Sequence, residues 1–403
     1  MRETCLIVGA GQCGLQVAER LRELGYHGRV LMVGEEPYLP YQRPPLSKRI
    51  ADPGFQTEDL WFRPADSLAK SSIELQLGVR ATRIVRNDRQ LEISDGRKLA
   101  YDRLVLATGA RARKIAVPGA SLGNVLYLRT LDEAIALRAA LLRARQVVVI
   151  GGGYIGLEIA AVARTAGANV TVLESGPRLL GRVASPLLSE YVASVHRSHG
   201  VEVVCDAEVQ GFQGGPAVEA VQTSDRRHRA DLVFVGIGIA PNEDLAREAG
   251  LRCDDGIIVD KEGRTSDPCI HAAGDCSRSH HPFYNASTRL ESVPGAVESA
   301  RAVAASICGR GALRKEVPWF WSHQFELHIQ SAGAWQDADE VVLKGNPRAH
   351  SFAYQYCKSG RPIGVDAVNN ARLYMTARKS IDPKEAIRVT AERPPSATQL
   401  HGL

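Results

Sequence analysis

Two stretches of the chain share one pattern of apolar and small residues. In each stretch, a run of consecutive apolar residues meets glycines spaced G-x-G-x-x-G, and a segment with helical periodicity follows. The stretches are residues 5–14 and 146–156. A continuous apolar run is typical of a strand that is buried on both faces of a parallel sheet. The pattern therefore predicts two strand–turn–helix units of the kind that bind dinucleotides.

The glycines of such a unit have separate tasks. The first permits a tight turn, the second lets the backbone approach a pyrophosphate, and the third lets the helix pack on the strand. One fingerprint is a weak signal, whereas two complete copies are hard to obtain by chance. The candidate contacts are Gly9, Gly11 and Gly14 in the first copy and Gly151, Gly153 and Gly156 in the second.

An acid follows the second strand of each unit, where it can bind ribose hydroxyls. In the first unit Glu35 is the better candidate and Glu36 the alternative, and a solvated charge is the other interpretation. In the second unit the acid is Glu174, and a carboxylate at the ribose favours NADH because it repels the 2′-phosphate of NADPH. Arg178 and Arg182 lie close in the sequence and weaken this preference.

Several segments outside the fingerprints are candidates for ligand contact. Residues 37–48 contain four prolines, which predict an extended, rigid path that holds Lys48 or Arg43 against a ligand or forms a surface connector. The strand end Thr108–Gly109 allows close backbone approach or serves packing alone. The glycine-rich segment 236–242 borders a nucleotide or crosses between domains. Asp275 meets a ribityl or pyrophosphate group, balanced by amides or a helix N-terminus, or caps a helix.

The remaining periodicities predict further elements and a compositional change near residue 318. Strands are expected at residues 73–77, 81–85, 91–93, 101–110, 201–209, 230–236, 257–260 and 269–276, with a hairpin turn at 95–96 and a helix over 292–307. After residue 318 an aromatic stretch, strand-like alternation, a turn at 358–362 and a helix at about 371–381 predict a small α+β domain. The aromatic stretch 319–321 favours interdomain packing over a cofactor wall.

Composition narrows the function classes. The 403 residues suffice for two or three domains, and 44% hydrophobic and 24% charged residues are typical of a soluble globular protein. A net charge of +5 does not indicate a nucleic-acid partner. The eight cysteines form no C-x-x-C pair, so neither a metal site nor a disulfide framework is expected. A first strand from about residue 4 leaves no room for a signal peptide, and no apolar run is long enough for membrane insertion, so a cytoplasmic location is expected.

The ordered combination of motifs resembles a known family. Besides the two fingerprints, the chain contains five further motifs, in the order Pro-Tyr-Gln-Arg-Pro-Pro-Leu-Ser-Lys, Ala-Thr-Gly, Gly-Ile-Gly-Ile-Ala-Pro-Asn, Ala-Gly-Asp-Cys and Trp-Phe-Trp-Ser. Together they resemble bacterial FAD-dependent ferredoxin reductases, of the putidaredoxin reductase and aromatic dioxygenase reductase type. Apoptosis-inducing factor is a more distant relative. The resemblance extends from about residue 4 to about residue 380.

The resemblance implies an α/β fold with two Rossmann-like nucleotide-binding domains, similar to glutathione reductase, and a small α+β C-terminal interface domain. Residues 1–111 and 241–318 would form the FAD-binding domain, residues 112–240 the NAD-binding domain, and residues 319–403 the interface domain.

It also implies roles for individual residues. Lys48 would lie near flavin N5 and pair with Glu158, Glu158 would lie beside the nicotinamide, and Trp321 would cover the reaction site. The candidate FAD contacts are Gly9, Gly11, Cys13, Gly14, Glu35, Arg43, Lys48, Ala81, Thr108, Gly109, Arg129, Asp275 and Val293. The candidate NAD contacts are Gly151, Gly153, Ile155, Gly156, Glu158, Glu174, Arg182 and Gly238.

Two positions depart from the family pattern. His323 replaces the usual Asp of Trp-Ser-Asp-Gln, which changes the local charge near the flavin and bears on redox potential and partner docking. Residues 294–296 are Pro-Gly-Ala where the family usually has Gln-Asn-Ala at the start of the helix after Ser292. Proline is sterically acceptable in a first helical turn.

The activity that the resemblance implies is hydride transfer from NADH to FAD, followed by single-electron delivery to a [2Fe–2S] ferredoxin that serves a haem monooxygenase or a Rieske-type oxygenase. A disulfide reductase or peroxidase of the same fold needs a redox cysteine near the flavin, and no cysteine occurs between Cys13 and Cys205. A rubredoxin reductase differs only in its acceptor. An NADH-sensing flavoprotein of the apoptosis-inducing-factor type is the alternative from another class. A monomer or weak dimer is expected.

Overall fold

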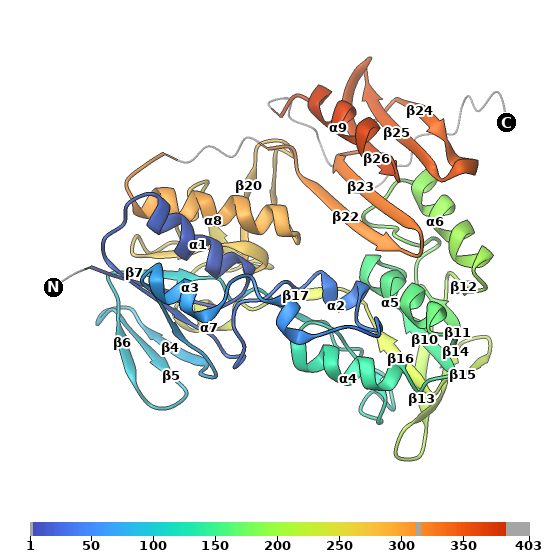
Figure 1. Cartoon of the computed structure of the whole chain (residues 1–403), viewed down its shortest axis with the longest axis horizontal. Coiled ribbons are helices and arrows are strands. Elements are labelled where there is room, and N and C mark those ends of the chain that lie inside the picture. The colour runs from blue at the N-terminus through green and yellow to red at the C-terminus, as the bar shows by residue number, and fades with distance from the viewer. Residues whose placement is uncertain (1–2, 312–315, 384–403) are drawn as a thin grey trace.

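A computed structural model describes residues 3–311 and 316–383 of the chain (Figure 1). The N-terminal apolar run is the central strand of a five-stranded parallel sheet with the order β19-β7-β1-β2-β3. Its strands are β1 (Thr4–Val8), β2 (Arg29–Val33), β3 (Ile73–Gln76), β7 (Arg103–Leu106) and β19 (Ile270–Ala272). The last strand comes from far along the chain, so the first unit is completed by a later segment.

Both faces of this sheet are covered, which explains the unbroken apolar runs. Cys5 and Ile7 of β1 pack toward the paired helices α1 (Gln12–Glu23) and α8 (Val293–Ile307). Leu6 and Val8 pack toward a small antiparallel sheet. That sheet contains β4 (Ala81–Val85), β5 (Gln90–Ile93) and β6 (Lys98–Ala100), and the turn between β5 and β6 lies at the expected Asp95–Gly96.

The second fingerprint opens a unit with the same layers. Its parallel sheet has the order β12-β11-β10-β16-β9. The strands are β9 (Val125–Leu126), β10 (Gln146–Ile150), β11 (Asn169–Leu173), β12 (Glu202–Val204) and β16 (Leu232–Val235). Three helices cover one face, namely α4 (Leu131–Leu141), α5 (Tyr154–Thr165) and α6 (Pro186–Ser198). The antiparallel strands β13 (Val209–Gly214), β14 (Val218–Thr223) and β15 (Arg227–Arg229) cover the other.

Two short strands connect the two units. β8 (Ala110–Ala112) and β17 (Ile239–Pro241) pair antiparallel where the chain leaves the first unit and where it returns. The glycine-rich segment 236–242 therefore includes a crossing strand, which was one of its two expected roles. The boundaries at residues 111/112 and 240/241 remain a proposal, which this strand pair supports.

The remaining short elements of the described chain surround these units. They are α2 (Pro45–Lys48), η1 (Thr57–Leu60), α3 (Ala65–Lys70), α7 (Asp244–Glu248), β18 (Ile257–Val259), η2 (Gly274–Cys276), β20 (Ser277–His281), β21 (Ala286–Thr288) and η3 (Pro347–Ala349).

Four sequence-based expectations about local structure were wrong in part. The expected strand 101–110 is two strands, β7 and β8, and the expected strand 269–276 ends with β19 and is followed by the turn η2. Residues 37–48 are not extended throughout, because Pro44 already has helical angles and Pro45 opens the single turn α2, a position that proline tolerates. The expected strand 201–209 is two strands, β12 and β13, separated near Asp206, which has a positive φ of 53°.

The C-terminal residues form a third sheet, as the change in composition predicted. Its antiparallel order is β22-β23-β26-β25-β24, and one helix packs on it. Its elements are β22 (Trp319–Gln324), β23 (Leu327–Gly333), β24 (Glu340–Asn346), β25 (Ser351–Lys358), β26 (Arg361–Val368) and α9 (Ala371–Ser380). Figure 1 shows this sheet beside α5 and α6, with β22 packed against α5. The end of the expected domain, residues 384–403, lies outside the described residues.

Candidate active site

A cavity of about 1380 Å³ lies where the first unit, the second unit and the C-terminal sheet meet. This volume exceeds the range of ordinary small-ligand pockets, so the space suits a large cofactor together with a second ligand. From the first unit, the lining includes Gly9, Gly11, Cys13, Glu35, Glu36, Arg43, Ser47, Lys48, Ala81, Thr108, Gly109, Asp275 and Val293, and Arg129 reaches it from the segment before α4. From the other two parts, it includes Ile155, Glu158, Ile237, Phe320 and Trp321.

The structure therefore brings the expected FAD set together, with Gly14 as the exception. A Cβ on Gly14 would lie 2.0 Å from the Gly9 carbonyl oxygen, so Gly14 lets α1 approach the glycine loop. Most of the expected NAD set lies away from this cavity, with Ile155 and Glu158 in its lining. The other expected NAD contacts are not part of the lining, namely Gly151, Gly153, Gly156, Glu174, Arg182 and Gly238.

The two glycine loops have the same geometry. Gly9 and Gly151 both have positive φ, and a Cβ on either would lie within 2.5 Å of a carbonyl oxygen of a neighbouring strand end. Gly11 and Gly153 each precede a helix that has no side-chain cap, and a Cβ on either would meet nothing within 4 Å. Open space thus lies before two uncapped helix N-termini, which is a favourable arrangement for a pyrophosphate. The residues present fit two dinucleotides.

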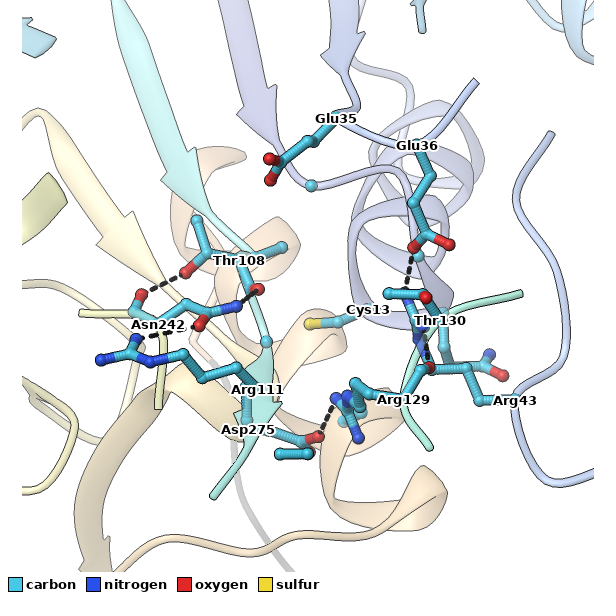
Figure 2. A pocket seen from close by; sticks show the side chains of 18 of the residues that line it. Cys13, Glu35, Glu36, Arg43, Thr108, Arg111, Arg129, Thr130, Asn242 and Asp275 are labelled. Carbon is cyan, nitrogen blue, oxygen red and sulfur yellow. Dashed lines mark hydrogen bonds and ion pairs between the residues drawn. The ribbon is translucent and has the colours of Figure 1, made fainter. Parts of the chain in front are cut away.

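The two neighbouring acids of the first unit have different surroundings. Figure 2 shows Glu35 and Glu36 pointing apart. Glu36 forms an ion pair with Arg43 at 2.7 Å and accepts a hydrogen bond from the Tyr41 hydroxyl at 2.7 Å. Burial opposes the charge of Glu36, but the Arg43 charge and these hydrogen bonds prevail and lower the pKa of Glu36. Glu35 is exposed to the cavity and has no hydrogen-bond partner among the described residues, which favours it as the ribose ligand.

Arg43 has a mainly structural environment. Its guanidinium binds Glu36 and also donates to the Arg129 carbonyl, so it ties residues 37–48 to the start of α4. A direct contact between Arg43 and FAD remains a prediction.

Asp275 and Arg129 form an ion pair at 2.7 Å beside Cys13 (Figure 2). Arg129 is therefore the counter-charge of Asp275, in place of the amides or helix N-terminus that the sequence suggested. The helix-cap alternative is wrong, because Ala273 holds the cap position of η2. Cys13 is the only cysteine among the described residues that line the cavity, and burial raises its pKa well above the usual value. Its sulfur therefore stays a thiol, without thiolate reactivity.

Thr108 and Asn242 join the two crossing segments at the cavity wall. The Thr108 hydroxyl donates to the Asn242 carbonyl at 2.6 Å, and the Asn242 amide donates back to the Thr108 carbonyl at 2.9 Å. Arg111 donates to the Asn242 side chain at 3.1 Å (Figure 2). The segment around Asn242 therefore crosses between the units and also lines the cavity. That it borders a nucleotide stays a prediction.

The central feature of the cavity is a buried ion pair between the two units. Lys48 of α2 lies 2.9 Å from Glu158 of α5, and their side chains are 14% and 0% exposed. Ser47 donates to Glu158 at 2.5 Å, and Ser322 of β22 donates at 2.6 Å. A buried carboxylate needs such partners, because burial without them is costly. The pairing of Lys48 with Glu158 that the resemblance implied is present in the structure.

The aromatic stretch of β22 has two functions. Phe320 packs against Tyr154 of α5, with ring centroids 4.5 Å apart, and both Phe320 and Trp321 line the cavity. The preference for interdomain packing over a cofactor wall was therefore incomplete. The structure adds three lining residues that the sequence did not identify as ligand contacts, namely Ser47, Asn242 and Phe320. Ser322 and Gln324 are two further residues of the site, and they lie behind the lining in the hydrogen-bond network of Glu158. Alternation along β22 was the available signal for Ser322 and Gln324.

Two layered α/β units with uncapped glycine loops and a C-terminal α+β sheet meet at one cavity, an arrangement that fits a protein binding two dinucleotides. The chain belongs to the pyridine nucleotide-disulphide oxidoreductase family, whose model matches residues 3–300, and a model described as reductase C-terminal matches residues 319–398. Membership implies the use of a flavin and of NAD(H).

Individual relatives agree over nearly the whole chain. Putidaredoxin reductase of Pseudomonas putida is 40% identical over 394 residues, covering 94% of this chain and 93% of the relative. Rhodocoxin reductase of Rhodococcus erythropolis is 42% identical over 377 residues, covering 93% and 88%. The solved covalent complex of putidaredoxin reductase with putidaredoxin matches with a TM-score of 0.91 and 39% identity, covering 95% of this chain and 93% of that chain.

These matches confirm the resemblance to ferredoxin reductases, the fold class and the enzymatic function: the chain is an NAD(H)-dependent oxidoreductase of the ferredoxin reductase type. Among the described residues, no helix is long and apolar enough to cross a membrane. The same residues contain no cluster of His, Cys, Asp and Glu side chains suited to a metal ion.

Proposed function

We propose that this chain is an NADH-dependent FAD flavoprotein that passes electrons to a [2Fe–2S] ferredoxin. The observation that carries the proposal is the buried pair between Lys48 and Glu158, which joins the two nucleotide-binding units inside the shared cavity. Bound FAD would supply acceptance of a hydride and release of electrons one at a time.

The proposal assigns tasks to the residues of the first unit. The loop at Gly9 and Gly11 would hold the FAD pyrophosphate through the amides of α1, and Glu35 would hold a ribose. The ion pair of Arg129 and Asp275 would border the same cofactor. The further candidate contacts to FAD are Cys13, Gly14, Arg43, Ala81, Thr108, Gly109 and Val293.

Three residues would act at the reacting centre. Lys48 would present its ammonium to the flavin, held in place by Glu158. Glu158 would lie beside the nicotinamide, and Trp321 would cover the site and exclude water.

The second unit supports a preference for NADH. Glu174 accepts hydrogen bonds from the Gly152 and Gly176 amides at 2.6 and 2.8 Å, which hold its carboxylate beside the glycine loop. Arg178 donates to the Ala184 and Gly181 carbonyls, so that its guanidinium is already engaged. The other candidate contacts to NAD are Gly151, Gly153, Ile155, Gly156, Glu158, Arg182 and Gly238.

A ferredoxin as electron acceptor is supported by the names of the relatives and by the solved putidaredoxin complex. The environment of Cys13 argues against a disulfide or peroxide acceptor, since the cavity lining in the described chain offers no second thiol to pair with it. The ferredoxin would in turn serve a haem monooxygenase or a Rieske-type oxygenase. A cytoplasmic location and a monomer or weak dimer remain predictions.

The test is stopped-flow spectroscopy of the FAD-loaded protein. Mixing with NADH should bleach the flavin absorbance, and a [2Fe–2S] ferredoxin added afterwards should restore it rapidly. Rubredoxin serves as the parallel acceptor, and faster reoxidation by rubredoxin would favour the rubredoxin reductase alternative. A long-lived charge-transfer complex that ignores both acceptors would contradict the proposal and favour an NADH-sensing flavoprotein.

A further inference from the structure

Glu158 receives hydrogen bonds from two separate parts of the chain. Ser47 and Lys48 approach its carboxylate from α2, and Ser322 approaches from β22 of the C-terminal sheet. Ser322 is fully buried, and Glu158 itself is 1% exposed. The C-terminal sheet therefore reaches the central ion pair through a hydroxyl as well as through its aromatic side chains.

The hydrogen bonds continue behind Ser322 into the second unit. The Gln324 amide nitrogen lies 3.1 Å from the Ser322 oxygen, and the Gln324 amide oxygen lies 2.9 Å from Nε2 of His196 in α6. Gln324 and His196 are also buried. Three consecutive bonds thus link α6, β22 and the carboxylate on α5.

The direction of these bonds follows from the acceptor at their end. An ionised carboxylate only accepts, so the Ser322 hydroxyl donates to Glu158 and its oxygen accepts from the Gln324 amide. The Gln324 oxygen then faces His196, whose proton must lie on Nε2. Burial lowers the pKa of His196 to about 4, which is consistent with a neutral ring near neutral pH. In each of these three hydrogen bonds, the donor therefore lies on the side away from Glu158 and the acceptor on the side toward it.

We infer that Ser322 and Gln324 are positioning residues for Glu158, through which the C-terminal sheet controls the carboxylate that holds Lys48. The inference rests on the proposed function, in which this ion pair faces the flavin and the nicotinamide. Ser322 follows Trp321 directly in β22, so one strand provides both a side chain that lines the cavity and the hydroxyl that donates to the carboxylate. Loss of the donor should remove one of the hydrogen bonds that fix the Glu158 carboxylate, and should therefore loosen its position against Lys48.

Other titratable groups lie near the ion pair of Lys48 and Glu158. Lys48 is the counter-charge of Glu158, and burial raises the pKa of Tyr154 on α5, so that its hydroxyl stays neutral in any assay. His323 is exposed, and burial, His328 and Lys48 together lower its pKa. His196 is separated from Glu158 by Gln324 and Ser322 in the hydrogen-bond network.

The experiment compares S322A with S331A in the FAD-loaded protein. Ser331 lies on the adjacent strand β23 and donates to a different buried carboxylate, Asp366, at the same distance of 2.6 Å. The limiting rate of flavin reduction by NADH is measured in both variants, together with the dissociation constant for NADH.

S322A should reduce the limiting rate about tenfold, the effect of losing one hydrogen bond to a charged group. NADH binding should change less than twofold. S331A should match the wild type in both quantities. Equal rates in S322A and S331A would overturn the inference.

A double-mutant comparison tests whether Ser322 acts through Glu158. In an E158Q background, S322A should have no additional effect on the rate of flavin reduction, whereas an equal loss in both backgrounds would overturn the inference. If S322A does not retain FAD, Q324M is measured in its place against the same control. The wild type is measured first: failure of wild-type flavin reduction would contradict the proposed function, while normal wild-type behaviour with an unaffected S322A would contradict this inference alone.

Discussion

At the scale of single residues, neighbouring acids in one sequence motif have unlike tasks. Glu36 is engaged by Arg43 and Tyr41, whereas Glu35 is open to the cavity. Glu174 in the second unit is engaged by the protein and is also the expected ribose ligand, since its carboxylate accepts hydrogen bonds from two loop amides. Its substitution therefore alters loop structure as well as nucleotide selectivity.

The variant E174R should bind NADH about 10-fold to 100-fold more weakly, because it removes a charged hydrogen-bond acceptor, and should gain affinity for NADPH. The measurement is the dissociation constant of each nucleotide by titration. E174Q is the matched control, since it keeps one oxygen for a loop amide but has no charge. It should lose only the repulsion of the 2′-phosphate, and should therefore gain less NADPH affinity than E174R. Unchanged selectivity in E174R would remove Glu174 from the ribose site.

At the scale of elements, α1 is set against β1 by the glycines that precede and begin it. A Cβ on Gly14 would lie 2.0 Å from the Gly9 carbonyl oxygen, whereas a Cβ on Gly11 would meet open space. The same fingerprint thus contains one glycine that the helix packing needs and one that the ligand needs.

The variants G14A and G11A should separate these needs. G14A should lower the melting temperature of the protein without FAD, because a backbone clash costs about 1–3 kcal/mol. G11A should leave that melting temperature nearly unchanged and should weaken FAD binding, since its methyl group projects toward the expected pyrophosphate. Thermal unfolding with and without FAD measures both effects. A stable G14A protein would show that α1 can shift to make room.

At the scale of the whole molecule, buried histidines make stability depend on pH. Burial is the first cause that lowers the pKa of His271 to about 4, with the charges of Arg103 and Arg264 adding to it. The unfolded chain has a histidine pKa near 6.5, so between about pH 6.5 and 4 it binds more protons than the folded protein. Stability is complete above this window and falls as the pH decreases through it.

The variant H271L should lose less stability than the wild type when the pH is lowered from 7.5 to 5. The difference should be about 2 kcal/mol, since each unit of pH inside the window contributes about 1.4 kcal/mol for one histidine. Chemical unfolding at the two pH values measures it. Replacing the exposed His280 by leucine is the control, and an equal acid effect in both variants would show that His271 is not the responsible group.

The sequence by itself determined both nucleotide-binding units, because their glycines and unbroken apolar strands follow from local steric demands and from burial on two faces. It also carried the family resemblance and most of the first-unit residues that line the cavity. Only the tertiary structure decided which charges meet, such as Arg129 with Asp275. It also decided that Ser322 and Gln324 reach Glu158, since α5, β22 and α6 come together through packing that no local pattern encodes.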